Sequence, residues 1–210
     1  MIDPELLLAV VIFALTATVS PGGATTLATA SGIQFGIRRS VPLLTGVACG
    51  LGVLVAVAAA GLGGLMQTYA GVQVALEAGG AAYLLWLAWK IGTSPAHDTA
   101  GGNTIAPISF TGAVLLLWAN PKAWSMSLAA AASYSAVANS AALLAITLGL
   151  VFAIAAACSM SIWCIAGQAF TKVLRSAWHW RLVNCILATV LACTTVPMWT
   201  NVFRQLGNAS

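Results

Sequence analysis

The sequence has very little charge for its length. Its 210 residues include 8 lysines and arginines and 4 aspartates and glutamates, so charged residues make up 6% of the chain and hydrophobic residues 60%. A soluble globular chain carries about 25% charged residues, which solvate its surface. This shortage excludes a cytosolic enzyme and a disordered tail. It also excludes a nucleic-acid-binding module, because the few cations are spread along an apolar chain and form no basic face.

Motifs that bind metals or carry out covalent chemistry are also scarce. The five cysteines form no CxxC pair, and we expect them to be buried in helices as small apolar side chains. His97 and His179 fall in basic connections, with no second ligand at metal-binding spacing. We therefore expect no cofactor. Export of a small cation or metal, which needs ligands clustered inside the membrane, stays an alternative function, and an intramembrane enzyme is a less favoured one.

Long uncharged stretches dominate the chain. They cover residues 6–37, 40–76, 123–171 and 182–203. Each exceeds the roughly 20 apolar residues that span a bilayer. Turn signals within them predict six transmembrane helices, over about residues 6–31, 42–66, 71–91, 108–132, 141–167 and 183–203. We therefore expect an all-α integral membrane protein in which residues 1–210 form a single polytopic domain.

The positions of the cations predict the orientation of these helices. Arg38 and Arg39 follow the first predicted helix, Lys90 ends the third, and three further cations follow the fifth. The turns after the second and fourth helices carry no charge. Because lysine and arginine concentrate in cytoplasmic connections, the odd connections are predicted to be cytoplasmic. Both termini are then expected outside the cytoplasm.

An internal repeat relates the two halves of the chain. When residue n is laid on residue n+100, the sequence Ser20, Pro21, Gly22 falls on Asn120, Pro121, Lys122. The chain then consists of repeat one, about residues 1–92, and repeat two, about residues 108–205. Each repeat holds three helices, and since three is odd the second copy enters the membrane from the opposite side. Such inverted repeats are typical of secondary transporters.

The two repeated prolines predict broken helices. Proline lacks a backbone N–H and disfavours helical angles in the residue before it, while serine and asparagine are good N-caps. We therefore expect Ser20 and Asn120 to cap new half-helices that begin deep in the membrane at Pro21 and Pro121. The free amide groups of such a start favour an anionic ligand. The alternative is that both prolines only kink continuous helices.

Glycines after the first break leave its backbone accessible. Gly22 and Gly23 have no side chain, so a ligand or the lysine of the other repeat, Lys122, is able to come close. Lys122 lies near the middle of a predicted span, where a charge needs a partner or a function. It is a candidate for substrate binding or proton coupling, or a structural cation. Glu77 is a candidate ion-pair partner or proton acceptor, or else it compensates a helix dipole.

A GxxxG spacing at Gly46 and Gly50 predicts close helix packing. The contact is either within the chain or between subunits. The motif is therefore compatible with a homo-oligomer as well as with a monomer.

Three motifs together resemble a known family. They are SPGGATTLATASGIQFGIRRS from Ser20, GGAAYLLWLAWKIG from Gly79 and NPKAWSMSL from Asn120, and they resemble the lysine exporter and homoserine/threonine resistance (LysE/RhtB) translocators. The resemblance implies a six-helix exporter of amino acids or related metabolites in the bacterial inner membrane, driven by proton exchange. It assigns the site to residues of all three motifs: Pro21, Gly22, Tyr83, Asn120, Pro121 and Lys122. Gly23 departs from the PGP that is usual in the family.

These observations combine into a hypothesis for the site. The substrate carboxylate rests against the half-helix starts at Gly22 and Lys122, and carbonyl groups freed at the breaks, or Glu77, hold its ammonium group. Ser20 and Gly23 complete the predicted site. The partners expected are therefore an amino acid, protons and the lipid bilayer.

Overall fold

The protein is helical throughout the part that the structure describes. The structure is a computed structural model that describes residues 2–62, 70–93, 107–170 and 177–207. Its elements are α1 (Pro4–Val19), α2 (Gly23–Val57), the π-helix η1 (Ala58–Leu62), α4 (Ala70–Gly92), α5 (Phe110–Trp118), α6 (Pro121–Ser133), the 3-10 helix η2 (Ser135–Val137), α7 (Ala141–Phe170), α8 (Ala177–Thr194) and α9 (Val196–Gly207). The predicted all-α fold class is confirmed.

Two of the described helices are long and apolar enough to cross a membrane. They are α2 continued into η1, over Gly23–Gly61, and α7. The predicted spans 108–132 and 183–203 are each divided into two shorter helices by a break, whereas α4 runs unbroken over the predicted span 71–91. The arrangement of six spans in two inverted repeats therefore stays a prediction, although the fold is that of an apolar helical membrane protein.

The division predicted between helices 6–31 and 42–66 is present as a sharp turn at Gly36 inside α2 and not as a loop. Ser31 Oγ and Ser40 Oγ lie 2.7 Å apart across this turn, so α2 consists of two helical segments that meet at Gly36. The predicted helix 183–203 is interrupted at Thr195, where α8 ends and α9 begins. The predictions 71–91 and 141–167 agree with α4 and α7 to within a few residues.

The kink in α2 is stabilised by side chains around it. Gly36 has a φ of 71°, a left-handed conformation that glycine adopts without steric cost. The N–H of Ile37 loses its helical acceptor there and donates to Gln168 Oε1 of α7 at 3.0 Å. Ser40 Oγ donates to the carbonyl oxygen of Gly36 at 2.8 Å. The backbone groups released by the kink are thus satisfied by neighbouring polar side chains.

Close glycine contacts hold α2 against α7. A methyl group on Gly32 would overlap the backbone of Cys164, and one on Gly52 would lie 2.8 Å from the carbonyl oxygen of Gly149. Gly36 lies beside Gln168 and Gly52 beside Gly149, so the segment of α2 that follows Gly36 runs antiparallel to α7. Small residues permit the backbones to approach in this way, as in other packed membrane helices.

The GxxxG pair of α2 forms a contact within the chain. A methyl group on Gly46 would overlap the carbonyl oxygen of Phe110, and one on Gly50 would lie 3.3 Å from Leu117, both on α5. Between the two alternatives for this motif, the structure thus shows internal packing of α2 on α5.

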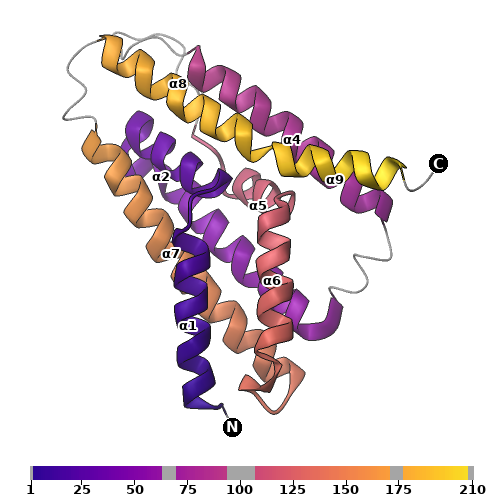
Figure 1. Ribbon diagram of the computed structural model, residues 1–210. Helices are drawn as coiled ribbons and strands as arrows, with labels where there is room; N and C mark the ends of the chain where they lie inside the picture. Colours follow the sequence, from indigo (N-terminus) through magenta and orange to yellow (C-terminus); the bar gives the residue numbers. More distant parts are fainter. Residues whose placement is uncertain (1, 63–69, 94–106, 171–176, 208–210) are drawn as a thin grey trace.

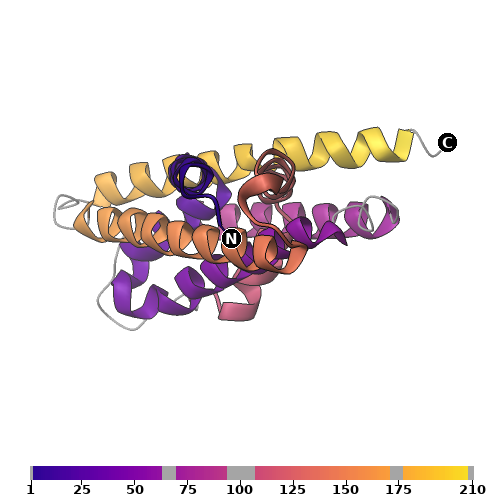
Figure 2. The ribbon, with the colours of Figure 1, turned by 90° about the horizontal axis from the view of Figure 1, so that it is seen from below.

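The helices form two groups. Helices α1, α2, α5, α6 and α7 make one bundle, whereas α4 runs beside α8 and α9 along its upper edge in Figure 1. Within the second group, a methyl group on Gly92 of α4 would lie 3.2 Å from Ala188 of α8. Figure 2 shows α1 and α6 nearly end on and next to one another.

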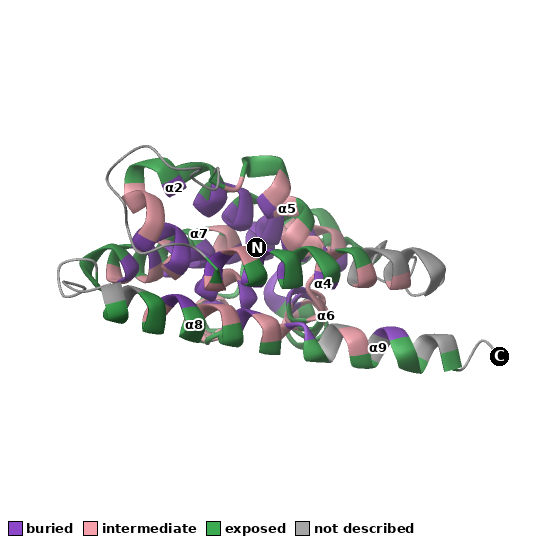
Figure 3. Ribbon diagram, turned by 90° about the horizontal axis from the view of Figure 1, so that it is seen from above, coloured by how far each residue is buried: buried purple, intermediate pink, exposed green. Residues whose placement is uncertain are grey.

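Buried residues lie where the helices face each other, and outward faces are exposed (Figure 3). The exposed face of α7 is apolar and includes Ile146, Leu150, Ile154, Ile162 and Ile165. A lipid-facing helix has such a surface.

The prediction that the cysteines are buried is wrong for most of them. Cys164 is buried, whereas Cys49, Cys158, Cys185 and Cys193 are exposed on helix surfaces. Helical periodicity in a uniformly apolar sequence does not distinguish a lipid-facing position from an interior one.

Candidate functional site

Both predicted helix breaks are present in the structure. Helix α1 ends at Val19, Ser20 has extended backbone angles, and α2 begins at Gly23. In the second repeat α6 begins at Pro121 with Asn120 as its N-cap, as predicted. Ser20 differs from the prediction, because it is the C-cap of α1 and the N-cap of α2 is Gly22. The first break is therefore longer than the second.

The start of α6 is capped by its own residues. Asn120 Oδ1 accepts the N–H of Lys122 at 3.0 Å, and the carbonyl oxygen of Asn120 accepts the N–H of Ala123 at 3.0 Å. Pro121 has no N–H to satisfy. The first turn of α6 therefore has no backbone donor left for a ligand.

The start of α2 is different because its N-cap is a glycine. Gly22 exchanges hydrogen bonds with the side chain of Thr25, at 2.8 and 2.9 Å, and has no side chain of its own to cap the helix. The N–H groups of Gly23 and Ala24 donate to no other residue that the structure describes. They stand at the positive end of the α2 dipole and line a cavity. This helix start is thus open to an acceptor.

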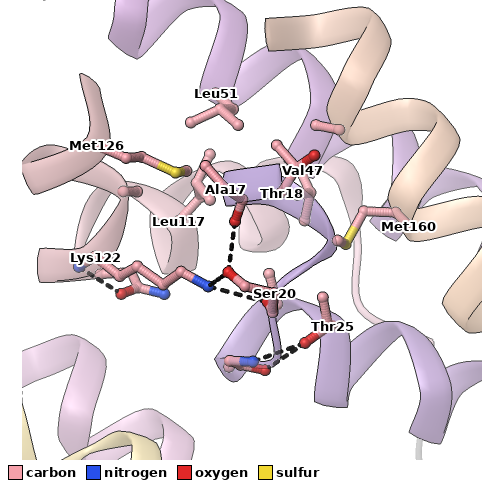
Figure 4. A pocket seen from close by; sticks show the side chains of 16 residues that line it. Ala17, Thr18, Ser20, Thr25, Val47, Leu51, Leu117, Lys122, Met126 and Met160 are labelled. Carbon is pink, nitrogen blue, oxygen red and sulfur yellow. Dashed lines mark hydrogen bonds between the residues drawn. The ribbon is translucent and has the colours of Figure 1, made fainter. Parts of the chain in front are cut away.

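Lys122 crosses from α6 to the first break. Its Nζ donates to Ser20 Oγ at 2.7 Å and to the carbonyl oxygens of Ser20 at 3.0 Å and Pro21 at 3.4 Å. Figure 4 shows the side chain extended toward Ser20. A side chain on Gly22 would obstruct this approach, since its Cβ would lie 3.3 Å from Nζ. The expectation that Gly22 lets the lysine of the other repeat come close is therefore confirmed.

Two further donors from α7 bind the end of α1. Ser159 Oγ donates to the carbonyl oxygen of Thr18 at 2.8 Å, and Trp163 Nε1 donates to that of Val19 at 3.2 Å. The carbonyl groups left free at the end of a helix need such partners. Neutral side chains of α7 thus satisfy the carbonyls of Thr18 and Val19, and a lysine satisfies the next two.

The cavity beside Lys122 is small and has two kinds of wall. Its volume is about 30 Å³, enough for one or two water molecules but not for an amino acid. One wall is polar and includes Ser20, Gly22 and Asn120, while the other is apolar. The apolar wall consists of Val47, Leu51, Leu117, Met126 and Met160. Lys122 is the only titratable residue among those that line it, and its side chain is exposed.

Tyr83 lies away from Lys122. It is 40% exposed on α4 and lines a separate cavity of about 340 Å³ between α4 and α5. Leu116 lines this cavity and also a narrow one of about 10 Å³, which reaches Asn120 and Gly23. The structure therefore does not bring Tyr83 into contact with the lysine, and Leu116 stands between the cavity of Tyr83 and the one that reaches Asn120.

The side chain of Glu77 lies outside the described residues, although its backbone belongs to α4. Its predicted pairing with Lys122 stays a prediction.

Sequence reasoning missed a third break at the site. Thr194 ends α8, and its Oγ1 lies 3.4 Å from the position that a Cβ of Gly23 would take. Asn120 Nδ2 lies 3.8 Å from the same position. The signal was Pro197, which like Pro121 stands just inside the start of a helix, here α9. Residues from α2, α6 and α8 therefore meet at Gly23.

Comparisons with known proteins show the family of the chain. A model of the LysE type translocator family matches residues 15–200 of the chain. Cysteine/O-acetylserine efflux proteins of Escherichia coli (strain K12) and Shigella sonnei (strain Ss046) are each 29% identical over 197 residues, which cover 93% of this chain and 98% of the relative. No solved structure matches. The matched region includes all three helix breaks, and the chain belongs to the LysE type translocator family.

Proposed function

We propose that this protein exports small neutral amino acids across the bacterial inner membrane in exchange for protons. The observation that carries the proposal is the α1–α2 break, which presents acceptors and donors side by side. Ser20 and Pro21 offer oxygens at the negative end of α1, and Gly23 and Ala24 offer amide groups at the positive end of α2. These two helix ends have opposite polarity.

This arrangement suits the zwitterionic part of an amino acid. An ammonium group needs oxygen acceptors, and a carboxylate needs N–H donors within a few ångströms of them. The amides of Gly23 and Ala24 and the Asn120 amide, which faces Gly23, supply the donors. The oxygens now bound to Lys122 supply the acceptors. The substrate carboxylate then lies against α2, close to the position expected from the sequence.

The remaining walls favour a small uncharged side chain. Methionine and leucine side chains face the polar break, and the lining residues that the structure describes include no carboxylate to pair with a lysine or arginine substrate. A charge buried without a partner is unfavourable. The relatives named as cysteine/O-acetylserine efflux proteins agree with such a substrate class.

The packing of the helices supports the inverted-repeat arrangement that the transport cycle requires. Helix α2 packs on α7 and α4 packs on α8 and α9, so helices of repeat one pair with their counterparts in repeat two. Rocking of one repeat against the other would expose the break alternately to each side. We further propose six spans with both termini outside the cytoplasm, as the cation distribution predicts.

An efflux assay tests the function. Cells that express the chain are loaded with dipeptides, and the amino acids that leave are compared with those from a vector control. We expect faster efflux of cysteine, serine and similar small amino acids, unchanged efflux of lysine and arginine, and loss of the effect when an uncoupler is added. If the protein reaches the membrane and no amino acid leaves faster than from the control, the proposed function is wrong.

A further inference from the structure

The structure assigns the three oxygens around Lys122 as a binding site for a primary ammonium group, which the lysine and the substrate occupy in turn. In this inference, which rests on the proposed function, Lys122 carries the proton that is exchanged for the amino acid. The Lys122 ammonium thus occupies the position that the substrate ammonium takes when it binds.

The geometry of the contact supports the assignment. A lysine ammonium has three N–H donors, and Nζ of Lys122 has three oxygen partners: Ser20 Oγ and the carbonyl oxygens of Ser20 and Pro21. An α-amino acid carries the same –NH₃⁺ group. A site that accommodates one of them therefore has the acceptors that the other needs.

The two ammonium groups exclude each other. They compete for the same three oxygens, and like charges at contact distance repel. Among the described residues, the lining contributed by α1, α2, α5, α6 and α7 includes no other titratable group that would offset a second positive charge. The substrate therefore enters when Lys122 leaves. In the proposed exchange the lysine leaves as a neutral amine, and water that reaches its exposed side chain takes up the proton.

The exchange balances over one transport cycle. On the outer side the amino acid leaves, the Lys122 amine takes up one proton, and its ammonium occupies the oxygens of Ser20 and Pro21. The protein returns with this charge in place. On the inner side Lys122 releases the proton to the cytoplasm and the next amino acid binds. One proton enters for each zwitterion exported. The structure corresponds to the state in which Lys122 occupies the ammonium site, because the cavity left beside it is only about 30 Å³.

Transport by the purified full-length protein in liposomes tests this inference with two assays. The first follows uptake of labelled cysteine driven by a pH gradient, and the second follows exchange of labelled for unlabelled cysteine at equal pH. For Lys122→Ala we expect exchange within about threefold of wild type and gradient-driven uptake reduced at least tenfold. For Lys122→Arg we expect both to be lost, because a guanidinium does not release its proton and stays on the oxygens.

Substrate affinity at different pH values gives a second readout. Because protonated Lys122 competes with the substrate, we expect the wild-type Kd to rise about tenfold for each unit by which pH is lowered once the lysine is protonated. In Lys122→Ala the Kd should not depend on pH. Lys90→Ala is the matched control, since Lys90 lies over the Trp86 ring of α4 and away from this site. It should behave as wild type in every assay.

Each result separates this inference from the proposed function. Equal loss of exchange and gradient-driven uptake in Lys122→Ala, with the variant correctly folded, would mean that the lysine holds the substrate and is not its competitor. Wild-type gradient-driven uptake by Lys122→Ala would mean that another group carries the proton. Lys122→Gln repeats the test if the alanine variant does not fold. Absence of exchange in the wild-type protein for every amino acid would overturn the proposed function itself.

Discussion

The α1–α2 break and the α5–α6 break occupy equivalent positions in the two predicted repeats, yet they differ in the backbone groups that they leave without a partner. At α6, Asn120 caps the helix and its first turn needs no further partner. At α2, the cap is Gly22, and the amides of Gly23 and Ala24 stay open to the cavity. The second repeat instead contributes Lys122, which reaches the open break. In the proposed function, one predicted repeat thus offers the groups that bind the substrate and the other supplies the charge.

Closing the open break should have the largest effect on transport. In Gly22→Asn the new side chain caps α2 as Asn120 caps α6, and its Cβ lies 3.3 Å from the present position of Lys122 Nζ. We expect efflux to fall about a hundredfold, because several charge-assisted hydrogen bonds of about 1.5–3 kcal/mol each are blocked. The thermal stability of the purified protein should not decrease, since a cap is gained. Wild-type efflux by this variant would show that the open cap is not needed.

Removing one oxygen from the ammonium site should have a smaller effect. Ser20→Ala deletes the hydroxyl that lies 2.7 Å from Lys122 Nζ and leaves both backbone carbonyls. We expect substrate affinity to weaken about tenfold, measured as KM for efflux, in keeping with one hydrogen bond to a charged group. Ser125→Ala is the matched control, because Ser125 Oγ also bonds a backbone carbonyl, that of Pro121. An equal change in both variants would place the effect outside the ammonium site.

The cap of α6 should matter for stability more than for transport. In Asn120→Ala the N–H of Lys122 loses its acceptor, which costs about 1 kcal/mol and lowers Tm by about 2–4 °C. Ser109→Ala removes the corresponding cap of α5, where Ser109 Oγ accepts the N–H of Gly112 at 3.1 Å. We expect both variants to melt earlier in detergent by similar amounts. Efflux should fall a few-fold only in Asn120→Ala, since Asn120 also faces Gly23.

The sequence predicts the breaks better than it predicts their partners. Pro21 and Pro121 act on their own backbone, so the interruption of each helix is readable without a structure. The N-cap residue of α2 cannot be predicted in this way. Ser20 and Gly22 are both acceptable caps, and the hydrogen bond between Gly22 and Thr25 decides between them. The kink at Gly36 likewise depends on Gln168, which is distant in the sequence.

Placement of Tyr83 and Thr194 shows the same limit. Tyr83 belongs to a motif of the family, but the helix that carries it turns the ring toward a different cavity. Thr194 belongs to no motif, and only the packing of α8 brings it to Gly23. Which face of an apolar helix points inward depends on contacts across the bundle, and a nearly uniform hydrophobic sequence carries little information about that direction.

Substitution of Thr194 should have the smallest effect on transport, and the neighbouring Thr195 provides a close control. Its hydroxyl donates to the carbonyl oxygen of Leu191 at 2.7 Å, which leaves its lone pairs facing Gly23 as acceptors. Thr195 makes the same kind of bond, to Ala192 at 2.7 Å, but is buried in packing. We expect Thr194→Val to lower efflux of hydroxyl- or thiol-bearing amino acids two- to fivefold relative to alanine, about the value of one neutral hydrogen bond. Thr195→Val should leave that ratio unchanged. If the efflux of these amino acids relative to alanine were the same in both variants, the third break would support the fold of the site without contacting the side chain of the substrate.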